Sequence, residues 1–384
     1  MNTIDILFSL LRSAVKGETL SCGIEKLINE KELSELFVLS EKHDLAHIIG
    51  LALSQNGLLD DGETSKKFKK QIMLAMYRYE VKLAEIISIS ELFESERLEF
   101  LQLKGQTIAR YYPEPWMRTS CDIDILVSED EVGRAKTLLC EKLGYEVKAL
   151  GRYDVSLFAP SGIHLELHFK LKNAFTKTEV CLEDLRKYMV ENAEERFALS
   201  FTDEYLLFYA ASHAAKHLAK SGCGIRQIID LWFIEKNLEI SEDVLKSYLD
   251  EVSMTTFLDG VRMLNEVWLE GREHTMFTRK MENFILDSGS YGTRENSVAI
   301  GKKSAGSQVA YILRRIFVPL ETLKGSYPIL EKYPCLVPVM LVRKWFFTLS
   351  PKRFRRAVGD LKRSAGVPSE KADAITDVLK ELGL

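Results

Sequence analysis

Closely spaced cysteines are missing from this sequence of 384 residues. The chain has six cysteines, and no two of them form a CxxC motif. They are Cys22, Cys121, Cys140, Cys181, Cys223 and Cys335. In a chain of this length, such isolated cysteines are typical of reduced thiols, mostly buried, and they indicate a reducing compartment.

Long apolar runs are absent as well, because no stretch reaches the ~18 residues that a membrane-spanning helix needs. The closest, CLVPVMLV at 335–342, contains Pro338 and is followed by Arg343 and Lys344. The N-terminus has no basic region ahead of its short apolar stretch and carries Asp5 in the first turns of an expected amphipathic helix, which argues against a secretion signal. We therefore expect a cytoplasmic protein with no membrane span.

A strong net charge of either sign is also lacking. Charged residues make up 28% of the chain, and the formal net charge is -4. This balance gives no general attraction to nucleic acid or to anionic membranes, so no stable nucleic-acid complex is expected. With 46% hydrophobic residues the chain can bury a large core, and its length predicts two or three structural units.

The spacing of apolar residues divides the chain into three regions. Residues 1–98 contain no proline and place apolar residues three and four apart, which predicts helices. Residues 99–178 contain alternating runs separated by turn-formers, together with helical stretches, and predict a small mixed α/β unit. From 179 to 384 the pattern is helical again, except for a stretch rich in Gly and Ser at 287–308, which we expect to be a flexible loop. The predicted fold class is α+β, with a mixed-sheet core flanked by N-terminal and C-terminal helical regions.

Two aspartates interrupt the apolar run CDIDILV. On a strand, Asp122 and Asp124 point to one face, while Ile123 and Ile125 point to the other face and into the core. Two carboxylates this close repel each other. A divalent cation would remove the repulsion, and ligands made only of oxygen suit magnesium or manganese.

The run HLELH repeats this geometry, because His164, Glu166 and His168 share one face of a strand. If this strand pairs beside the first, Glu166 joins the two aspartates as a third carboxylate. Three carboxylates on neighbouring strands can hold two metal ions, and such a site suits in-line phosphoryl or nucleotidyl transfer. His168 is then placed to orient Glu166 or the acceptor of the transferred group.

A candidate anion site lies upstream, in LKGQTIARYY. A predicted strand ends at Lys104 and Gly105, and a helix begins directly after it. Backbone N–H groups at such a junction bind anions, and Gly105 lets a phosphate approach closely. Lys104 adds a positive charge, and Arg118, four residues before Asp122, is placed for a second phosphate contact.

Each of these patterns also has an ordinary structural explanation. The DID run can be an edge strand with solvated carboxylates, Lys-Gly is common turn chemistry, and HLELH can be a half-exposed strand with no further task. The order of the patterns favours a functional interpretation: a strand-to-helix turn with glycine, an arginine, a DxD strand and an acidic strand all lie within one α/β unit.

A second polar group lies in the run SHAAKHLAK. His213, Lys216, His217 and Lys220 are spaced so that they share one stripe of a helix. The stripe could hold the triphosphate or the acceptor, or the two histidines could bind zinc, although Ala214 stands where HExxH motifs have glutamate. The ordinary alternative is a solvated basic helix face.

The run GIRQIIDLW places Asp230 among apolar residues, with Arg226 one turn before it. A buried ion pair is the simplest explanation. In the functional alternative, Arg226 contacts a phosphate and Asp230 orients Arg226.

Further along, residues 343–363 contain eight basic residues, one acid and four aromatics. This segment could contact RNA or an anionic bilayer, or it could form a solvated amphipathic helix pair.

Taken together, the motifs LKG, Tyr112-Pro113, Arg118, DIDILV and ELH resemble the nucleotidyltransferase superfamily, which includes polymerase-beta-type and aminoglycoside-modifying enzymes. More narrowly, they are similar to a family of uncharacterised bacterial nucleotidyltransferases. The motifs span roughly residues 101–170, and a looser similarity continues to about residue 235. One position departs from the superfamily pattern, because Gln106 stands where a second small residue is usual.

This resemblance implies a nucleotidyltransferase core over 99–178, magnesium or manganese as cofactor, and a nucleoside triphosphate as donor. It implies that Asp122, Asp124 and Glu166 bind the metals, and that Lys104, Gly105 and Arg118 hold phosphates. We expect transfer to the hydroxyl of an unknown acceptor, a small molecule or sugar in the first place. The alternatives are a modifier of protein or RNA of the toxin–antitoxin type, and a nucleotide sensor without activity, which Gln106 would favour.

Overall fold

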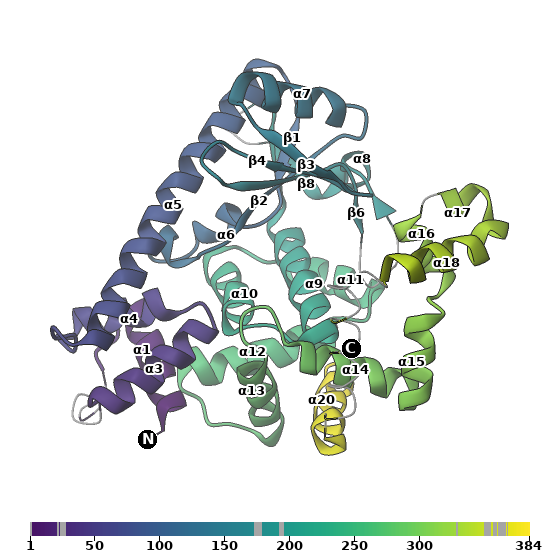
Figure 1. Ribbon diagram of the computed structural model, residues 1–384. Coiled ribbons are helices and arrows are strands. Elements are labelled where there is room, and N and C mark those ends of the chain that lie inside the picture. The colour runs from purple at the N-terminus through teal and green to yellow at the C-terminus, as the bar shows by residue number, and fades with distance from the viewer. Residues whose placement is uncertain are drawn as a thin grey trace.

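A seven-stranded mixed sheet lies at one end of the molecule and is flanked by helices from both ends of the chain (Figure 1). This computed structural model describes residues 2–20, 23, 28–172, 179–191, 196–327, 329–348, 355, 359, 366 and 368–384. The expected fold class, a mixed-sheet α+β core with helical flanks, is confirmed.

The N-terminal region is helical, as predicted. It contains α1 (Thr3–Lys16), α3 (Glu30–Lys42), α4 (Ala46–Gln55) and α5 (Glu63–Ser95). Helix α1 begins with a capping box between Asn2 and Asp5 and ends at Gly17, whose φ of 67° suits glycine. Helix α5 has no Gly or Pro in its 33 residues, so it runs unbroken for about 50 Å from the other N-terminal helices to the sheet (Figure 1).

The sheet has the strand order β3-β4-β5-β2-β1-β9-β8. Strand β2 pairs in parallel with β5, and β1 pairs in parallel with β9, while the other neighbours are antiparallel. Two of its strands, β8 and β9, lie after residue 178, and a small hairpin of β6 and β7 stands apart from the sheet. The elements of this part of the chain are β1 (Phe100–Gln102), α6 (Gln106–Ala109), η1 (Pro115–Met117), β2 (Asp122–Val127), α7 (Val132–Leu143), β3 (Glu146–Leu150), β4 (Asp154–Phe158), β5 (His164–His168), β6 (Leu171–Lys172), β7 (Glu179–Val180), α8 (Leu182–Leu185), η2 (Arg186–Tyr188), β8 (Met189–Glu191) and β9 (Ala198–Phe201).

The two faces of the sheet differ in chemistry. One face is apolar and packs against α7 and the end of α5; its buried residues include Ile123, Ile125, Leu165 and Leu167. This confirms that the isoleucines between the two aspartates point into the core. The carboxylates of β2 and β5 therefore lie on the opposite face, toward helix α9.

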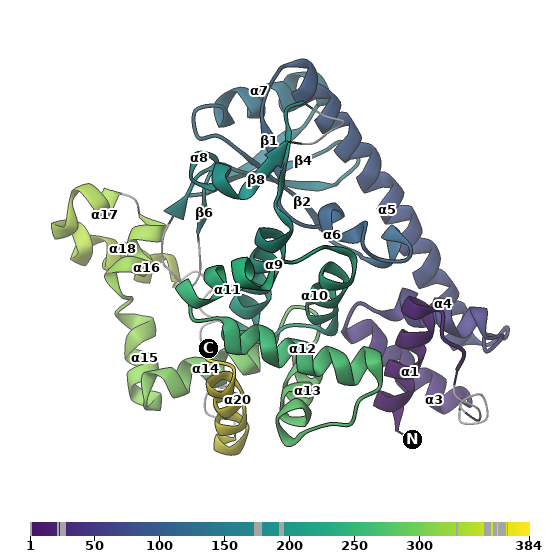
Figure 2. The ribbon, with the colours of Figure 1, turned by 180° about the vertical axis from the view of Figure 1, so that it is seen from behind.

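The C-terminal region is also helical. Its elements are α9 (Asp203–Ser221), α10 (Ile225–Asn237), α11 (Glu242–Glu251), α12 (Thr255–Glu270), α13 (Met276–Ser288), α14 (Arg294–Ala305), α15 (Gln308–Ile316), α16 (Leu320–Ser326), α17 (Ile329–Lys332), η3 (Pro334–Leu336), α18 (Val337–Thr348) and α20 (Ser369–Glu381). Helices α9, α10 and α12 share one large apolar core with α1, α3 and α4, so the N-terminal helices pack against the first helices of the C-terminal region (Figure 2).

The expectation of a flexible loop at 287–308 is wrong. Residues 294–305 form helix α14, which Thr293 caps by accepting a hydrogen bond from the Asn296 backbone. Two glycines serve close packing in this stretch: a Cβ added at Gly301 would lie 2.9 Å from the Tyr311 ring, and one at Gly292 would collide with Ser221. Composition alone cannot separate this cause from flexibility.

The expectation of mostly buried cysteines also needs correction. The five described cysteines are free thiols, but only Cys223 is buried, while Cys121 and Cys335 are exposed.

Within the described ranges, no helix is both long and apolar enough to cross a bilayer. Most of the basic segment expected to contact RNA or a bilayer, residues 349–363, lies outside the described residues apart from two isolated positions.

Candidate active site

Three carboxylates meet at the centre of the sheet. In the parallel pairing of β2 with β5, Asp124 lies opposite Glu166 and Asp122 lies opposite His164. Two groups of side chains have ligand atoms that all lie within 4.8 Å of one another: Asp122, His164 and Glu166 form one, and Asp124, Glu166 and His168 form the other. Glu166 belongs to both groups, so the sheet register brings together the acidic residues expected from the sequence.

Asp124 is the most buried of these acids, with 3% of its surface exposed. Its Oδ2 lies 3.2 Å from Lys104 Nζ, and its Oδ1 lies 3.1 Å from His168 Nε2. Burial opposes ionisation, but these two cations outweigh it and lower the pKa of Asp124 to about 2. Asp124 is therefore an anion at neutral pH, in a place where only cations make its burial tolerable.

His168 links the buried aspartate to Glu166, whose Oε2 lies 3.4 Å from His168 Nε2. Burial alone would lower the pKa of His168, but its contacts with Asp124 and Glu166 raise that pKa to about 9. The imidazole therefore holds both carboxylates in place. The sequence left open whether His168 orients Glu166 or the acceptor, and the structure shows a contact with Glu166.

Helix α9 faces the carboxylates. His213 and His217 line the same cleft as Asp122, Asp124 and Glu166. Burial, together with nearby lysines, lowers the pKa of both histidines, so they are neutral donors or acceptors at pH 7. Their ring centroids lie 4.5 Å apart, yet neither residue belongs to the two metal-ligand groups found among the described residues.

The two lysines of the stripe predicted on α9 do not line the cleft. Lys216 lines a neighbouring cavity, and Lys220 is exposed. The stripe predicted on α9 is therefore divided: His213 and His217 line the cleft, Lys216 lines a cavity that also contains Glu166, and Lys220 lines neither.

Gly105 begins the turn between β1 and α6. Its φ of 76° and ψ of -109° are accessible mainly to glycine, so this position needs glycine whatever it binds. Helix α6 has only four residues, Gln106–Ala109, and the Gln106 Nε2 is buried without a hydrogen-bond partner among the described residues. Gly105 lines the cleft together with Lys104.

Arg118 and Asp230 form a buried ion pair across the site. Arg118 Nε and NH2 donate to the two oxygens of Asp230, and Arg118 NH1 donates to the Gly105 carbonyl at 3.0 Å. Tyr112 donates a further hydrogen bond to Asp230. Three of the five N–H groups of Arg118 therefore donate in these contacts.

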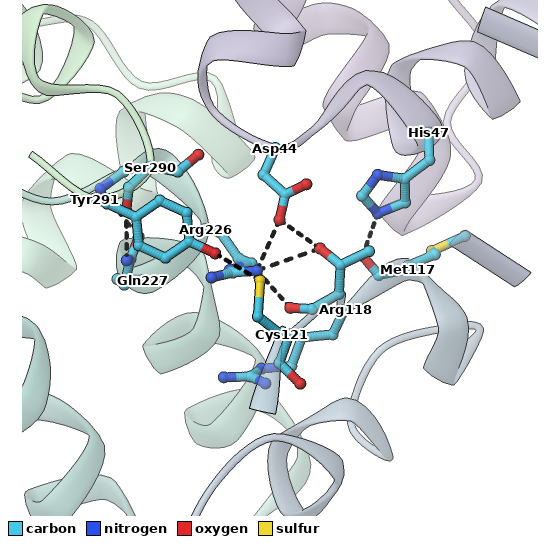
Figure 3. A network of polar contacts seen from close by, with 12 residues as sticks. Asp44, His47, Met117, Arg118, Cys121, Arg226, Gln227, Ser290 and Tyr291 are labelled. Carbon is cyan, nitrogen blue, oxygen red and sulfur yellow. Dashed lines mark hydrogen bonds and ion pairs between the residues drawn. The ribbon is translucent and has the colours of Figure 1, made fainter. Parts of the chain in front are cut away.

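Arg226 has a different partner from the one its spacing suggested. Its NH1 pairs with Asp44 Oδ2 at 2.8 Å and donates to the Thr119 carbonyl, as Figure 3 shows. The buried ion pair expected from GIRQIIDLW is present as two pairs, because Arg226 and Asp230 each reach a partner from another part of the chain. Asp44 carried no recognisable signal in the sequence.

Lys82 was also missed. This residue of helix α5 is 5% exposed, and its Nζ donates to the carbonyl and hydroxyl of Ser120, directly before the DID strand. Burial lowers the pKa of Lys82 to about 8, although the nearby Asp122 opposes this shift. A lysine in a long amphipathic helix carries no mark in the sequence that separates it from its exposed neighbours.

Three cavities lie at this site, and each of the two outer ones shares lining residues with the central cleft. The central cleft, of about 350 Å³, is lined by most of the residues described above. A smaller cavity of about 260 Å³ lies toward β4 and α9 and shares Lys104, Glu166 and His213 with the cleft. A larger cavity of about 730 Å³ lies toward α3 and α5 and shares Arg118 and Cys121 with the cleft.

Comparison with known proteins gives one family match. A family model described as "Uncharacterised nucleotidyltransferase" matches residues 29–270. No curated protein matches the chain. Among solved structures, the antibiotic-resistance factor ANT(2'')-Ia is similar at 14% identity, with a TM-score of 0.35, over 44% of this chain and 90% of that one.

Proposed function

The chain belongs to this family of uncharacterised nucleotidyltransferases, and we propose that it transfers a nucleoside monophosphate from a nucleoside triphosphate to a hydroxyl of an acceptor molecule. The observation that carries the proposal is the convergence of Asp122, Asp124 and Glu166 in one cleft with cationic side chains beside them. A structural ion pair alone would need neither a third carboxylate nor a cavity.

The donor set fits divalent cations. Asp122, Asp124 and Glu166 offer carboxylate oxygens from two adjacent strands, and oxygen-rich sites favour Mg²⁺ or Mn²⁺. These three residues would hold the ions, and His164 or His168 would complete or orient the set. When bound, the ions would neutralise charge on the phosphates and help to align the reacting oxygens.

The α-phosphate would lie in the part of the cleft that carries Lys104, Gly105 and Arg118. Lys104 would supply a charge to this phosphate, and the backbone of Gly105 would permit its close approach. Arg118 would act mainly by fixing this turn, because it donates to the Gly105 carbonyl. Asp230 and Arg226 would keep the loop before β2 in place, and His213 and His217 would add hydrogen bonds from α9.

The acceptor would enter from the smaller cavity, since Glu166 lines both that cavity and the cleft. The acceptor oxygen would form a bond to the α-phosphorus while the bond to the bridging oxygen breaks and pyrophosphate leaves. Glu166 would take the proton of the acceptor hydroxyl, and His168 would orient Glu166. Lys216 also lines this smaller cavity and would contact the acceptor.

A pyrophosphate-release screen tests this function. Each of the four ribonucleoside triphosphates is offered with Mg²⁺ and a library of small hydroxyl compounds, and the same reactions are run with a chelator. We expect release with one nucleotide and one acceptor class, and none in the chelator series. Tight nucleotide binding by calorimetry, with no release from any acceptor, would instead favour the nucleotide sensor. Absence of nucleotide binding would contradict the proposal.

A further inference from the structure

The cavity of about 730 Å³ beside the cleft has no task in the reaction outlined above. It lies beside the cleft, at the start of β2, and is walled by α3, α5, the 116–121 loop and the turn between α13 and α14. Four residues of α5 line it: Ala75, Arg78, Tyr79 and Lys82. Their spacing of three and four places them on one stripe of the helix, so α5 presents a continuous face to the cavity.

Charge makes this cavity suited to anions. It is lined by the cations Lys42, Arg78, Lys82 and Arg118, and by the acids Glu41 and Asp44. Arg118 is matched by Asp230, and Asp44 is matched by Arg226. This leaves three cations and one acid, and the cavity with this excess of positive charge shares Arg118 and Cys121 with the carboxylate cleft.

Arg78 is the cation most available to a ligand. It is exposed, and it makes no hydrogen bond or ion pair with any residue that the structure describes. Lys82 uses two of its three N–H groups on Ser120, and Lys42 donates to the Leu286 carbonyl at 2.7 Å. The guanidinium of Arg78 therefore keeps the fork geometry that favours bidentate contact with phosphate.

The opposite wall is held firmly in place. The Ser290 backbone donates to the Lys42 carbonyl at 3.0 Å, and Gln227 Nε2 donates to the Ser290 carbonyl at 2.8 Å. Tyr291, next in the chain, contacts Cys121 Sγ through its hydroxyl at 3.3 Å (Figure 3). The cavity and the cleft thus meet at Tyr291 and Cys121, one residue before Asp122.

We propose that this cavity binds the β- and γ-phosphates of the donor nucleotide and releases them as pyrophosphate, with Arg78 as a direct phosphate ligand. The inference rests on the proposed function. In-line transfer requires the leaving pyrophosphate and the attacking oxygen to lie on opposite sides of the α-phosphorus. In this proposal the acceptor lies in the smaller cavity beside Glu166. The cationic cavity meets the cleft at different residues, Arg118 and Cys121, so the leaving pyrophosphate has a place apart from the acceptor.

Inorganic pyrophosphate is the probe that tests this assignment. Its binding is measured by calorimetry with Mg²⁺ for the wild type, Arg78→Ala, Arg78→Lys and Lys70→Ala. Lys70 is an exposed lysine of the same helix outside the cavity, so it is the matched control. We expect about tenfold weaker binding in Arg78→Ala, partial recovery in Arg78→Lys and no change in Lys70→Ala. The affinity for a nucleoside monophosphate should be the same in all four proteins.

Three results would overturn the assignment. Equal pyrophosphate affinity in wild type and Arg78→Ala would remove Arg78 from the phosphate site while leaving nucleotidyl transfer intact. An equal loss for the nucleoside monophosphate would assign the cavity to the nucleoside instead. If the wild type binds nucleoside triphosphates but not pyrophosphate, the cavity is not a pyrophosphate site, and the proposed function is unaffected. If neither ligand binds, the proposed function and this inference are both wrong.

Discussion

Arg118 and Asp230 lie 112 residues apart in the chain, yet they meet in two parallel hydrogen bonds of 2.9 and 3.0 Å. Both side chains are less than 10% exposed. The pair joins helix α10 to the loop that leads into the DID strand. Since Arg118 also holds the Gly105 carbonyl, one ion pair fixes the glycine turn and the approach to β2 together.

Removing one partner of this pair should destabilise the protein. We expect Asp230→Ala to lower the free energy of unfolding by about 3–5 kcal/mol, because Arg118 and the Tyr112 hydroxyl would lose a buried partner. Urea denaturation measures this change. Arg134→Ala is the control, since Arg134 pairs with Glu96 and Glu131 at the surface and should lose less than about 1 kcal/mol. Similar losses in the two variants would contradict the structural role of the pair.

Asp124→Asn should remove metal-dependent activity while keeping the fold. The amide has nearly the shape of the carboxylate but lacks the charge that binds a cation, so we expect activity to fall by about 10²–10³-fold or more. Binding of Mn²⁺, followed by calorimetry, should weaken in parallel, while far-UV circular dichroism stays the same. Asp130→Asn, an exposed acid just after the same strand, should behave as wild type. Full activity of Asp124→Asn would rule out the carboxylate site.

Lys104→Gln should weaken nucleoside triphosphate binding about tenfold, because Lys104 is the lysine that lines the carboxylate cleft. Titration with a non-hydrolysable triphosphate and Mg²⁺ measures the loss. Lys220→Gln removes a lysine from the predicted stripe of α9 that lies outside all three cavities, and its affinity should not change. If the two variants lose affinity equally, general charge rather than position explains the binding.

Acid should destabilise the protein through His43. This buried residue contacts the Leu286 carbonyl, and burial lowers its pKa from 6.5 to about 4. Between these two values the unfolded chain binds a proton that the folded protein excludes, so stability falls as pH decreases. From pH 7 to pH 5 the loss from this group is about 2 kcal/mol.

His43→Gln provides the comparison for this pH dependence. Glutamine can donate to the Leu286 carbonyl but does not titrate, so its stability should decrease less between pH 7 and pH 5. The measurement is chemical denaturation at both pH values. An identical pH dependence in the two proteins would show that His43 does not cause the acid sensitivity.

Local patterns were enough to predict the strands and the faces of the sheet. The alternation of Asp122 and Asp124 with Ile123 and Ile125 sets their directions, because strand geometry depends only on neighbours in the chain. The similar alternation around Glu166 made a third acid predictable. The pairing of its strand with β2 stayed conditional in the sequence and was decided by the sheet.

The partners of the buried arginines were not predictable in the same way. Arg226 stands one helical turn from Asp230, but it pairs with Asp44, 182 residues away. Spacing along a helix indicates which side chains could meet, whereas tertiary packing decides which of them are buried together. Gly292 and Gly301 posed the same problem, since only the neighbouring surfaces reveal that these glycines allow close contact.

By itself, therefore, the sequence determined the α+β class, the acidic edge of β2 and the glycine turn before it, because each depends on local backbone geometry. Only the tertiary structure decided that α5 and the turn after α13 would build a cationic cavity beside that edge. The physical reason is that the excess charge there is a sum over residues from distant segments, and no short stretch of the chain contains enough of them to reveal it.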